Sequence, residues 1–261
     1  MDTVLFIHGA WVTPLCWRYL VPLFADRGYR TLAPAWPLKD RPAAQQLTYP
    51  DPRLAKVGIP EVVAHYRAII RSQPEPPVLI GHSFGGLIVQ ILLDQGFGAA
   101  GIVISSVPPR GVSALGASPV KAVKKLWTLF AARSGWRGIL APPVWNAEEK
   151  ALREAQGIET QLVPESRRIF WQLATREATV DFGNRARAPL LLVGCGRDRS
   201  VPVEAQRRNW ERYGDSPARA DFALFPELTH LCIAEPGHEE LAAYCMAWVG
   251  DRLADKAAVA A

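Results

Sequence analysis

The chain has 261 residues, of which 49% are hydrophobic and 21% are charged, and its formal net charge is +5. This balance is typical of a globular protein with enough apolar material for a core. No apolar run reaches about 18 residues and no basic-then-apolar leader precedes the first apolar stretch, so we expect a cytoplasmic protein without a transmembrane helix.

The first part of the chain alternates between apolar strand patterns and helical patterns. Strands are expected at 4–7, 29–37, 77–81 and 100–106. Helices are expected at 17–28, at 59–72 and directly after Ser83, whereas the Pro- and Gln-rich stretch up to about residue 57 predicts a loop. Short, continuously apolar strands separated by helices predict a parallel sheet covered on both faces.

After Pro108 this alternation stops. Residues 109–180 carry long helical patterns without a convincing strand, and the sheet pattern then resumes. The later elements are expected as strands at 188–196 and 222–225 and as helices at 203–213 and 239–255. The sequence therefore predicts an α/β core made of residues 1–108 and 181–261, interrupted by a helical insertion at 109–180.

The cysteines and histidines form no pattern that predicts a metal site or a disulfide framework. The four cysteines have no C-x-x-C spacing, and Ala242 stands where an H-E-x-x-H motif starting at His238 needs its second histidine. We therefore expect neither a metal nor a cofactor. No motif for binding nucleic acid is present, and a homodimer is compatible with the sequence.

The segment Gly81-His82-Ser83-Phe84-Gly85 lies between an apolar strand and an apolar helix. This context is typical of a nucleophile elbow, in which a serine takes a strained conformation and small neighbours let the strand and helix approach closely. The first N–H groups of the following helix can also stabilise a developing negative charge. We interpret Ser83 as a nucleophile.

A serine hydroxyl needs a base, and the base needs an acid that orients it. Asp198 follows the strand expected at 188–196, and His230 follows the strand expected at 222–225. Both positions lie at carboxyl ends of strands, where the loops of a parallel sheet meet. Less suitable candidates are Asp181 and Asp221 for the acid, and His65 and His238 for the base.

An oxyanion hole is expected where the first strand ends. His8-Gly9 lies at the turn over the top of the sheet. The backbone N–H of Ala10, together with that of Phe84 beside the nucleophile, would bracket the oxyanion of a substrate.

The segments LFIHGAW, GHSFGG, GRDRSVP and THLCIAEP, in this order, resemble the α/β-hydrolase superfamily. They are similar to its small, cofactor-free bacterial esterase-like members and to its plant esterase and hydroxynitrile-lyase branch. The resemblance covers about residues 2–108 and 181–255 and implies that 109–180 is a cap over the site. It also implies a triad in which Ser83 attacks, His230 is general base and then acid, and Asp198 orients the imidazole.

The resemblance implies Ala10 and Phe84 as the oxyanion donors. The hydroxynitrile lyases of this branch carry a lysine directly after the catalytic histidine, but this chain has Leu231 there, so we expect no cyanohydrin cleavage. Haloalkane dehalogenases and epoxide hydrolases need an aspartate where this chain has Ser83.

These patterns predict a serine hydrolase that cleaves a carboxylic ester, thioester or lactone of a small to medium apolar substrate through an acyl-enzyme. Three alternatives stay open: a carbon–carbon bond hydrolase, a cofactor-free perhydrolase, and a ligand receptor that kept the fold. Large apolar side chains of the cap and neighbours of the motifs are expected to line the pocket. They are Trp11, His82, Trp127, Phe130, Trp171 and Leu231.

Overall fold

The fold is built on a six-stranded sheet in the order β2-β1-β3-β4-β7-β8, in which all neighbouring strands are parallel. The computed structural model describes residues 2–112, 138–141, 162–214 and 216–260. The strands of this sheet are β1 (Thr3–Ile7), β2 (Arg30–Leu32), β3 (Val78–His82), β4 (Ala100–Ile104), β7 (Leu190–Cys195) and β8 (Ala220–Phe225). Because β1, β3, β4 and β7 are buried along their whole length, they read as continuous apolar runs in the sequence.

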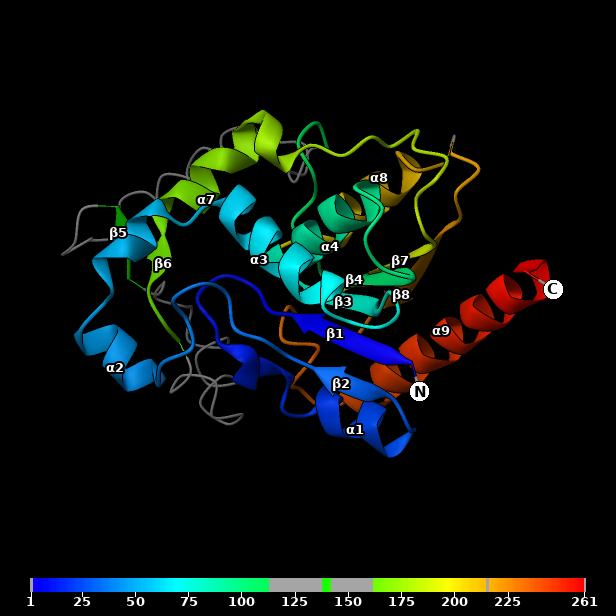
Figure 1. Cartoon of the computed structure of the whole chain (residues 1–261), viewed down its shortest axis with the longest axis horizontal. Coiled ribbons are helices and arrows are strands. Elements are labelled where there is room, and N and C mark those ends of the chain that lie inside the picture. The colour runs from blue at the N-terminus through cyan, green and yellow to red at the C-terminus, as the bar shows by residue number, and fades with distance from the viewer. Residues whose placement is uncertain (1, 113–137, 142–161, 215, 261) are drawn as a thin grey trace.

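Helices cover both faces of the sheet (Figure 1). One face carries α3 (Ile59–Arg71), α4 (Phe84–Asp94) and α8 (Val203–Glu211). The other face carries α1 (Leu20–Asp26) and α9 (His238–Ala260). In the described part of the chain, no helix is long and apolar enough to cross a membrane.

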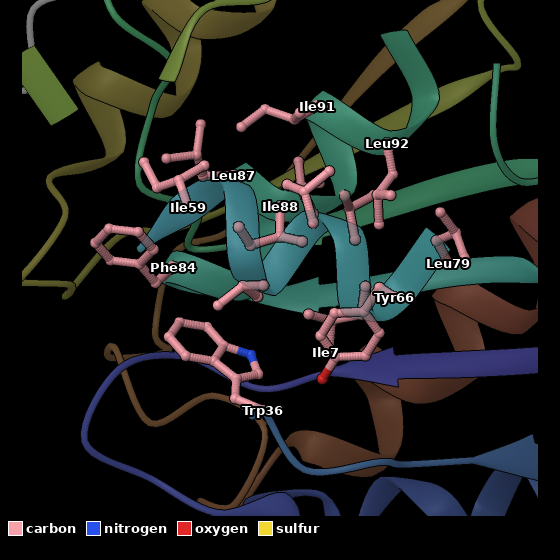
Figure 2. Packing of buried hydrophobic residues seen from close by; sticks show 14 of the residues in the cluster. Ile7, Trp36, Ile59, Tyr66, Leu79, Phe84, Leu87, Ile88, Ile91 and Leu92 are labelled. Atoms are coloured by element: carbon pink, nitrogen blue, oxygen red, sulfur yellow. The ribbon is translucent and has the colours of Figure 1, made fainter. Parts of the chain in front are cut away.

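The core between the sheet and helices α3 and α4 fixes the helix that carries the elbow (Figure 2). Leu87 and Ile88 of α4 are fully buried, as are Tyr66 of α3 and Leu79 of β3. Each aliphatic side chain buried in this way stabilises the fold by about 1.5–3 kcal/mol. The Tyr66 hydroxyl keeps a partner inside this core, since it donates a hydrogen bond to the Pro34 carbonyl oxygen at 2.9 Å.

The predicted fold class, a parallel α/β sheet covered by helices on both faces, is confirmed, with strands and helices in the expected order. Three local predictions differ from the structure. The expected strand at 29–37 is reduced to β2, and the expected helix at 17–28 is split into η1 (Pro14–Trp17) and α1. The expected loop before residue 57 contains α2 (Ala43–Thr48) and η2 (Pro52–Lys56), each shorter than the window in which a period is recognisable.

The prediction that residues 109–180 contain no strand is wrong. Strands β5 (Ile139–Leu140) and β6 (Glu165–Ser166) pair in antiparallel fashion, and both contact η2. Two-residue strands leave no alternation in the sequence, so pairing across this distance is invisible to pattern analysis. The segment continues through α7 (Arg167–Trp171), η4 (Gln172–Ala174) and η5 (Arg176–Ala178). Trp127 and Phe130 lie outside the described residues.

Candidate active site

Ser83 occupies a strained corner between β3 and α4. Its φ is 55° and its ψ is −120°, a conformation that a non-glycine residue adopts only when its surroundings impose it. The Ser83 N–H donates to the Ile104 carbonyl oxygen at 3.0 Å, and the Ser83 carbonyl accepts from the Val107 N–H at 3.0 Å. A Cβ at Gly85 would collide with the Ile7 carbonyl oxygen, which is the physical reason for glycine there.

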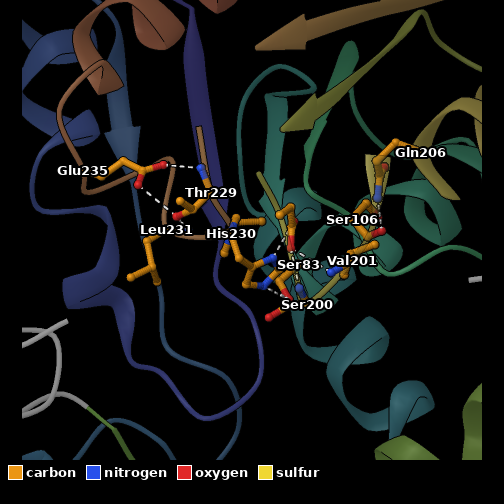
Figure 3. A network of polar contacts seen from close by, with 11 residues as sticks. Ser83, Ser106, Ser200, Val201, Gln206, Thr229, His230, Leu231 and Glu235 are labelled. Atoms are coloured by element: carbon orange, nitrogen blue, oxygen red, sulfur yellow. Dashed lines mark hydrogen bonds and ion pairs between the residues drawn. The ribbon is translucent and has the colours of Figure 1, made fainter. Parts of the chain in front are cut away.

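The structure brings Ser83, His230 and Asp198 together. His230 Nε2 lies 3.1 Å from Ser83 Oγ (Figure 3). On the other side of the ring, His230 Nδ1 lies 2.8 Å from Asp198 Oδ2. In this arrangement the Nδ1–H donates to the carboxylate, so Nε2 is free to accept the hydroxyl proton. The geometry has the order of partners that serine activation requires.

The Asp198 carboxylate is anchored on its other side by backbone groups. Its Oδ1 accepts hydrogen bonds from the N–H of Ser200 at 2.7 Å and from that of Val201 at 2.8 Å. Burial alone would raise the pKa of Asp198, but the His230 imidazole and the Val201 N–H favour the charged form, and the net shift of the pKa is downward. Asp198 is therefore an ionised partner for the imidazole at neutral pH.

The loop that carries His230 is held by two side chains. Glu235 binds Thr229 twice, since it accepts from the Thr229 N–H at 2.6 Å and from the hydroxyl at 2.8 Å (Figure 3). His82 Nε2–H donates to the His230 carbonyl oxygen at 2.8 Å. These contacts fix the backbone on both sides of the histidine.

His82 is expected from the sequence to line the substrate pocket. Its ring is buried and contacts the rings of Trp17 and His230.

The loop after β1 lies directly against the nucleophile. A Cβ at Gly9 would lie 3.0 Å from Ser83 Cβ, so this close approach depends on glycine. Ala10 follows Gly9, and Phe84 is the first residue of α4. Among the described residues, no protein group accepts a hydrogen bond from the N–H of Ala10 or of Phe84. Both N–H groups can therefore serve an oxyanion beside Ser83.

His8 has a role that the sequence analysis missed. The Trp36 N–H donates to His8 Nε2 at 3.1 Å, so Nδ1 carries the proton and donates to the Gly9 carbonyl oxygen at 2.8 Å. Burial and the nearby positive charge of Lys39 lower the pKa of His8 to about 3. His8 is thus an uncharged hydrogen-bonding group under the loop at neutral pH, and the His-Gly pair at the strand end is its only sequence signal.

An aromatic cluster borders the loop and the nucleophile. Trp11 stacks on Phe170 with ring centroids 4.6 Å apart, and Phe170 meets Phe84 edge-on at 5.6 Å. The expected pocket residue Trp171 is instead 60% exposed, because α7 turns Ile169 and Phe170 toward the core.

The remaining expected pocket residue, Leu231, is buried beside Ala234 and Tyr19. The described residues hold no group of three or more histidine, cysteine, aspartate or glutamate side chains that could bind a metal ion.

Comparisons with known proteins agree with this architecture. The chain is similar to the solved structure of a pyrethroid hydrolase from Sphingobium faniae JZ-2, at 21% identity over 95% of this chain and 96% of that one, with a TM-score of 0.68. It is also similar to polyneuridine aldehyde esterase (18% identity, 96% and 99% covered, TM-score 0.65). A methylesterase from Arabidopsis matches at 15% identity (96% and 99% covered, TM-score 0.61).

No curated protein sequence matches the chain significantly. At these identities the similar structures establish a shared fold. The model of the alpha/beta hydrolase family matches residues 4–244, which is most of the chain. The protein belongs to the alpha/beta hydrolase family.

Proposed function

We propose that this protein is a serine hydrolase that cleaves a carboxylic ester of a small to medium apolar substrate through an acyl-enzyme. The observation that carries the proposal is the chain of contacts from Ser83 Oγ through His230 to Asp198, at 3.1 and 2.8 Å. A serine that only filled the elbow would need neither a base at hydrogen-bond distance nor a buried acid behind that base.

In the proposed mechanism, His230 Nε2 removes the hydroxyl proton as Ser83 Oγ attacks the ester carbonyl carbon. The tetrahedral oxyanion binds the N–H groups of Ala10 and Phe84, and losing one such donor typically costs ~3 kcal/mol of transition-state stabilisation. His230 then gives the proton to the departing alcohol oxygen. A water molecule attacks the acyl-enzyme with the same histidine as base, which releases the acid and restores the serine.

An apolar substrate is favoured by the side chains around the loop. Trp11 and Phe170 stack on each other and are partly exposed, and Phe170 also contacts Phe84, the buried residue that follows Ser83. The exposed surface of Trp11 and Phe170 can bind an acyl or aryl group by burying apolar area. We place the cap, as residues 109–180, over this surface.

An ester is the substrate class that the comparisons favour. The similar structures include a pyrethroid hydrolase, an esterase and a methylesterase by name. Carbon–carbon bond hydrolases and perhydrolases use the same triad, so the triad alone does not separate them from esterases. Leu231 in place of the lyase lysine disfavours cyanohydrin cleavage.

The test is a panel of nitrophenyl esters, lactones and cleavable diketones, run with the wild-type protein and with Ser83→Ala. We expect turnover of esters and a loss of about 10⁴-fold or more in the variant, as is usual when a triad member is removed. Ser72→Ala, which changes an exposed serine at the end of α3, is the matched control and should keep full activity. Ester turnover that survives Ser83→Ala would refute the proposal.

A further inference from the structure

A buried ion pair lies behind the oxyanion loop. Lys39, from the loop after β2, and Glu165, from β6, are 126 positions apart in the sequence and contact each other through Nζ and Oε2. Both side chains are fully buried. The Lys39 ammonium also lies over the indole of Trp36, 5.1 Å from the ring centroid.

The Glu165 carboxylate also accepts hydrogen bonds from two backbone N–H groups. Oε2, which binds Lys39, also accepts from the Trp11 N–H at 3.2 Å, and Oε1 accepts from the Ser166 N–H at 2.8 Å. A buried ion pair needs such additional hydrogen bonds to offset the loss of hydration. The first of these two hydrogen bonds comes from Trp11, which directly follows the proposed oxyanion donor Ala10.

Trp11 is strained, and the segment around β6 holds it from both sides. Its φ is 60°, in the left-handed region that a tryptophan rarely adopts. Glu165 binds its N–H, and the Val163 N–H donates to its carbonyl oxygen at 2.8 Å. A strained conformation persists only where the surroundings over-determine it, and here two residues of one segment do so.

The other side of the loop is fixed by the same network. His8 holds the Gly9 carbonyl oxygen, and Trp36 both donates to His8 and stacks on its ring at 5.1 Å. The Gly9 carbonyl and the Ala10 N–H belong to one planar peptide and point in opposite directions. Since His8 binds the oxygen and Glu165 binds the next N–H, the orientation of the Ala10 N–H is set by contacts on both of its neighbours.

We propose that Lys39 and Glu165 are positioning residues of the oxyanion hole: the ion pair holds the Trp11 N–H and thereby aims the Ala10 N–H at the oxyanion formed on Ser83. This inference rests on the proposed function. In this proposal β6, which lies within the insertion at 109–180, supports the loop after β1 that carries the oxyanion donor. A positioning role also accounts for the burial of two charges that a pair of apolar side chains could replace in the core.

The experiment compares Glu165→Met, which removes the acceptor of the Trp11 N–H, with Lys39→Met and the double variant Lys39→Met/Glu165→Met on a nitrophenyl ester. We expect kcat to fall about tenfold or more in each, because an oxyanion donor that is misaligned loses part of the 10²–10³-fold effect of such a donor. KM should change less than twofold. The Ki of a trifluoromethyl ketone, whose adduct carries the oxyanion, should rise by the same factor as kcat falls.

The double variant separates positioning from stability. An apolar pair of similar volume often restores the stability that a broken ion pair loses. We therefore expect the double variant to recover the melting temperature. Its kcat should stay low, because the Trp11 N–H has lost its acceptor. Recovery of kcat together with the melting temperature would overturn the inference, since it would show that the pair serves folding alone.

Arg168→Met is the matched control, because it removes a half-exposed ion pair with Glu61 in the same segment. Its kcat should equal that of the wild type, and a loss as large as that of Glu165→Met would count against the inference. The proposed function and the positioning role can be refuted separately. Absence of ester turnover in the wild type refutes the proposed function, whereas a normal kcat and Ki in Glu165→Met beside an inactive Ser83→Ala refutes only the positioning role.

Discussion

His82 Nε2–H donates a hydrogen bond to the carbonyl oxygen of His230, and the two atoms are 2.8 Å apart. The residue next to the elbow serine therefore holds the backbone of the residue that activates this serine. The contact crosses 148 positions of sequence and links the end of β3 to the loop after β8.

We predict that His82→Phe lowers kcat by about tenfold and leaves KM unchanged, because the His230 loop loses its donor while the substrate surface is untouched. The His230 carbonyl would also be left without a partner, at a cost of about 1–3 kcal/mol in unfolding free energy. Steady-state kinetics and urea unfolding measure the two effects. His82→Gln keeps a donor and should recover part of kcat; equal kcat in Phe and Gln variants would contradict the prediction.

We predict that His230→Gln abolishes ester turnover and that His238→Gln does not. Glutamine cannot take a proton from Ser83, whereas His238 lies at the start of α9 and bonds the Glu235 carbonyl oxygen through Nδ1. Turnover of a nitrophenyl ester measures both variants, with circular dichroism as a check on folding. An inactive, folded His238→Gln would show that the base has been assigned to the wrong histidine.

The third prediction concerns the pH dependence of stability. Burial lowers the pKa of His8 from 6.5 to about 3, so the unfolded chain binds a proton that the folded chain excludes between these two values. Unfolding free energy should therefore be fully retained above pH 6.5 and fall as the pH drops toward 3, by up to about 1.4 kcal/mol per pH unit.

His8→Asn removes this proton linkage and should flatten the slope of unfolding free energy against pH, whatever its effect on absolute stability. Urea unfolding between pH 7 and pH 4 measures the slope. Ile88→Val is the control, since it destabilises the core by about 0.5–1.5 kcal/mol without changing any titrating group. If His8→Asn and Ile88→Val keep the same slope as the wild type, the linkage does not reside in His8.

The fourth prediction concerns the acyl chain. We expect kcat/KM for nitrophenyl esters to rise from acetate to a medium chain, because each buried methylene contributes ~0.8 kcal/mol, or close to fourfold. Phe170→Ala should flatten this profile, since its ring bridges Trp11 and Phe84. Trp171→Ala, at a side chain that is 60% exposed, should alter it much less. A wild-type profile that peaks at acetate would mean that the aromatic cluster does not bind the acyl group.

The sequence by itself determined the sheet and the elbow. Buried parallel strands are continuous apolar runs, and an elbow needs small residues at fixed offsets, so both leave local patterns that can be read without a structure. The order of Ser83, Asp198 and His230 after three strand patterns also placed these residues at one edge of the sheet. That their atoms lie within hydrogen-bond distance is a result of the fold.

Only the tertiary structure decided which residues support this site. Lys39 and Glu165 read as ordinary surface charges in the sequence, and nothing local distinguishes Phe170, which packs on the loop, from Trp171, which is exposed. The β5–β6 pair likewise joins two-residue strands that carry no period of their own. A local hydrophobic pattern shows which face of a helix or strand is buried, but it does not show which distant residue packs against that face. A contact between distant segments depends on packing, and packing is settled only when the whole chain has folded.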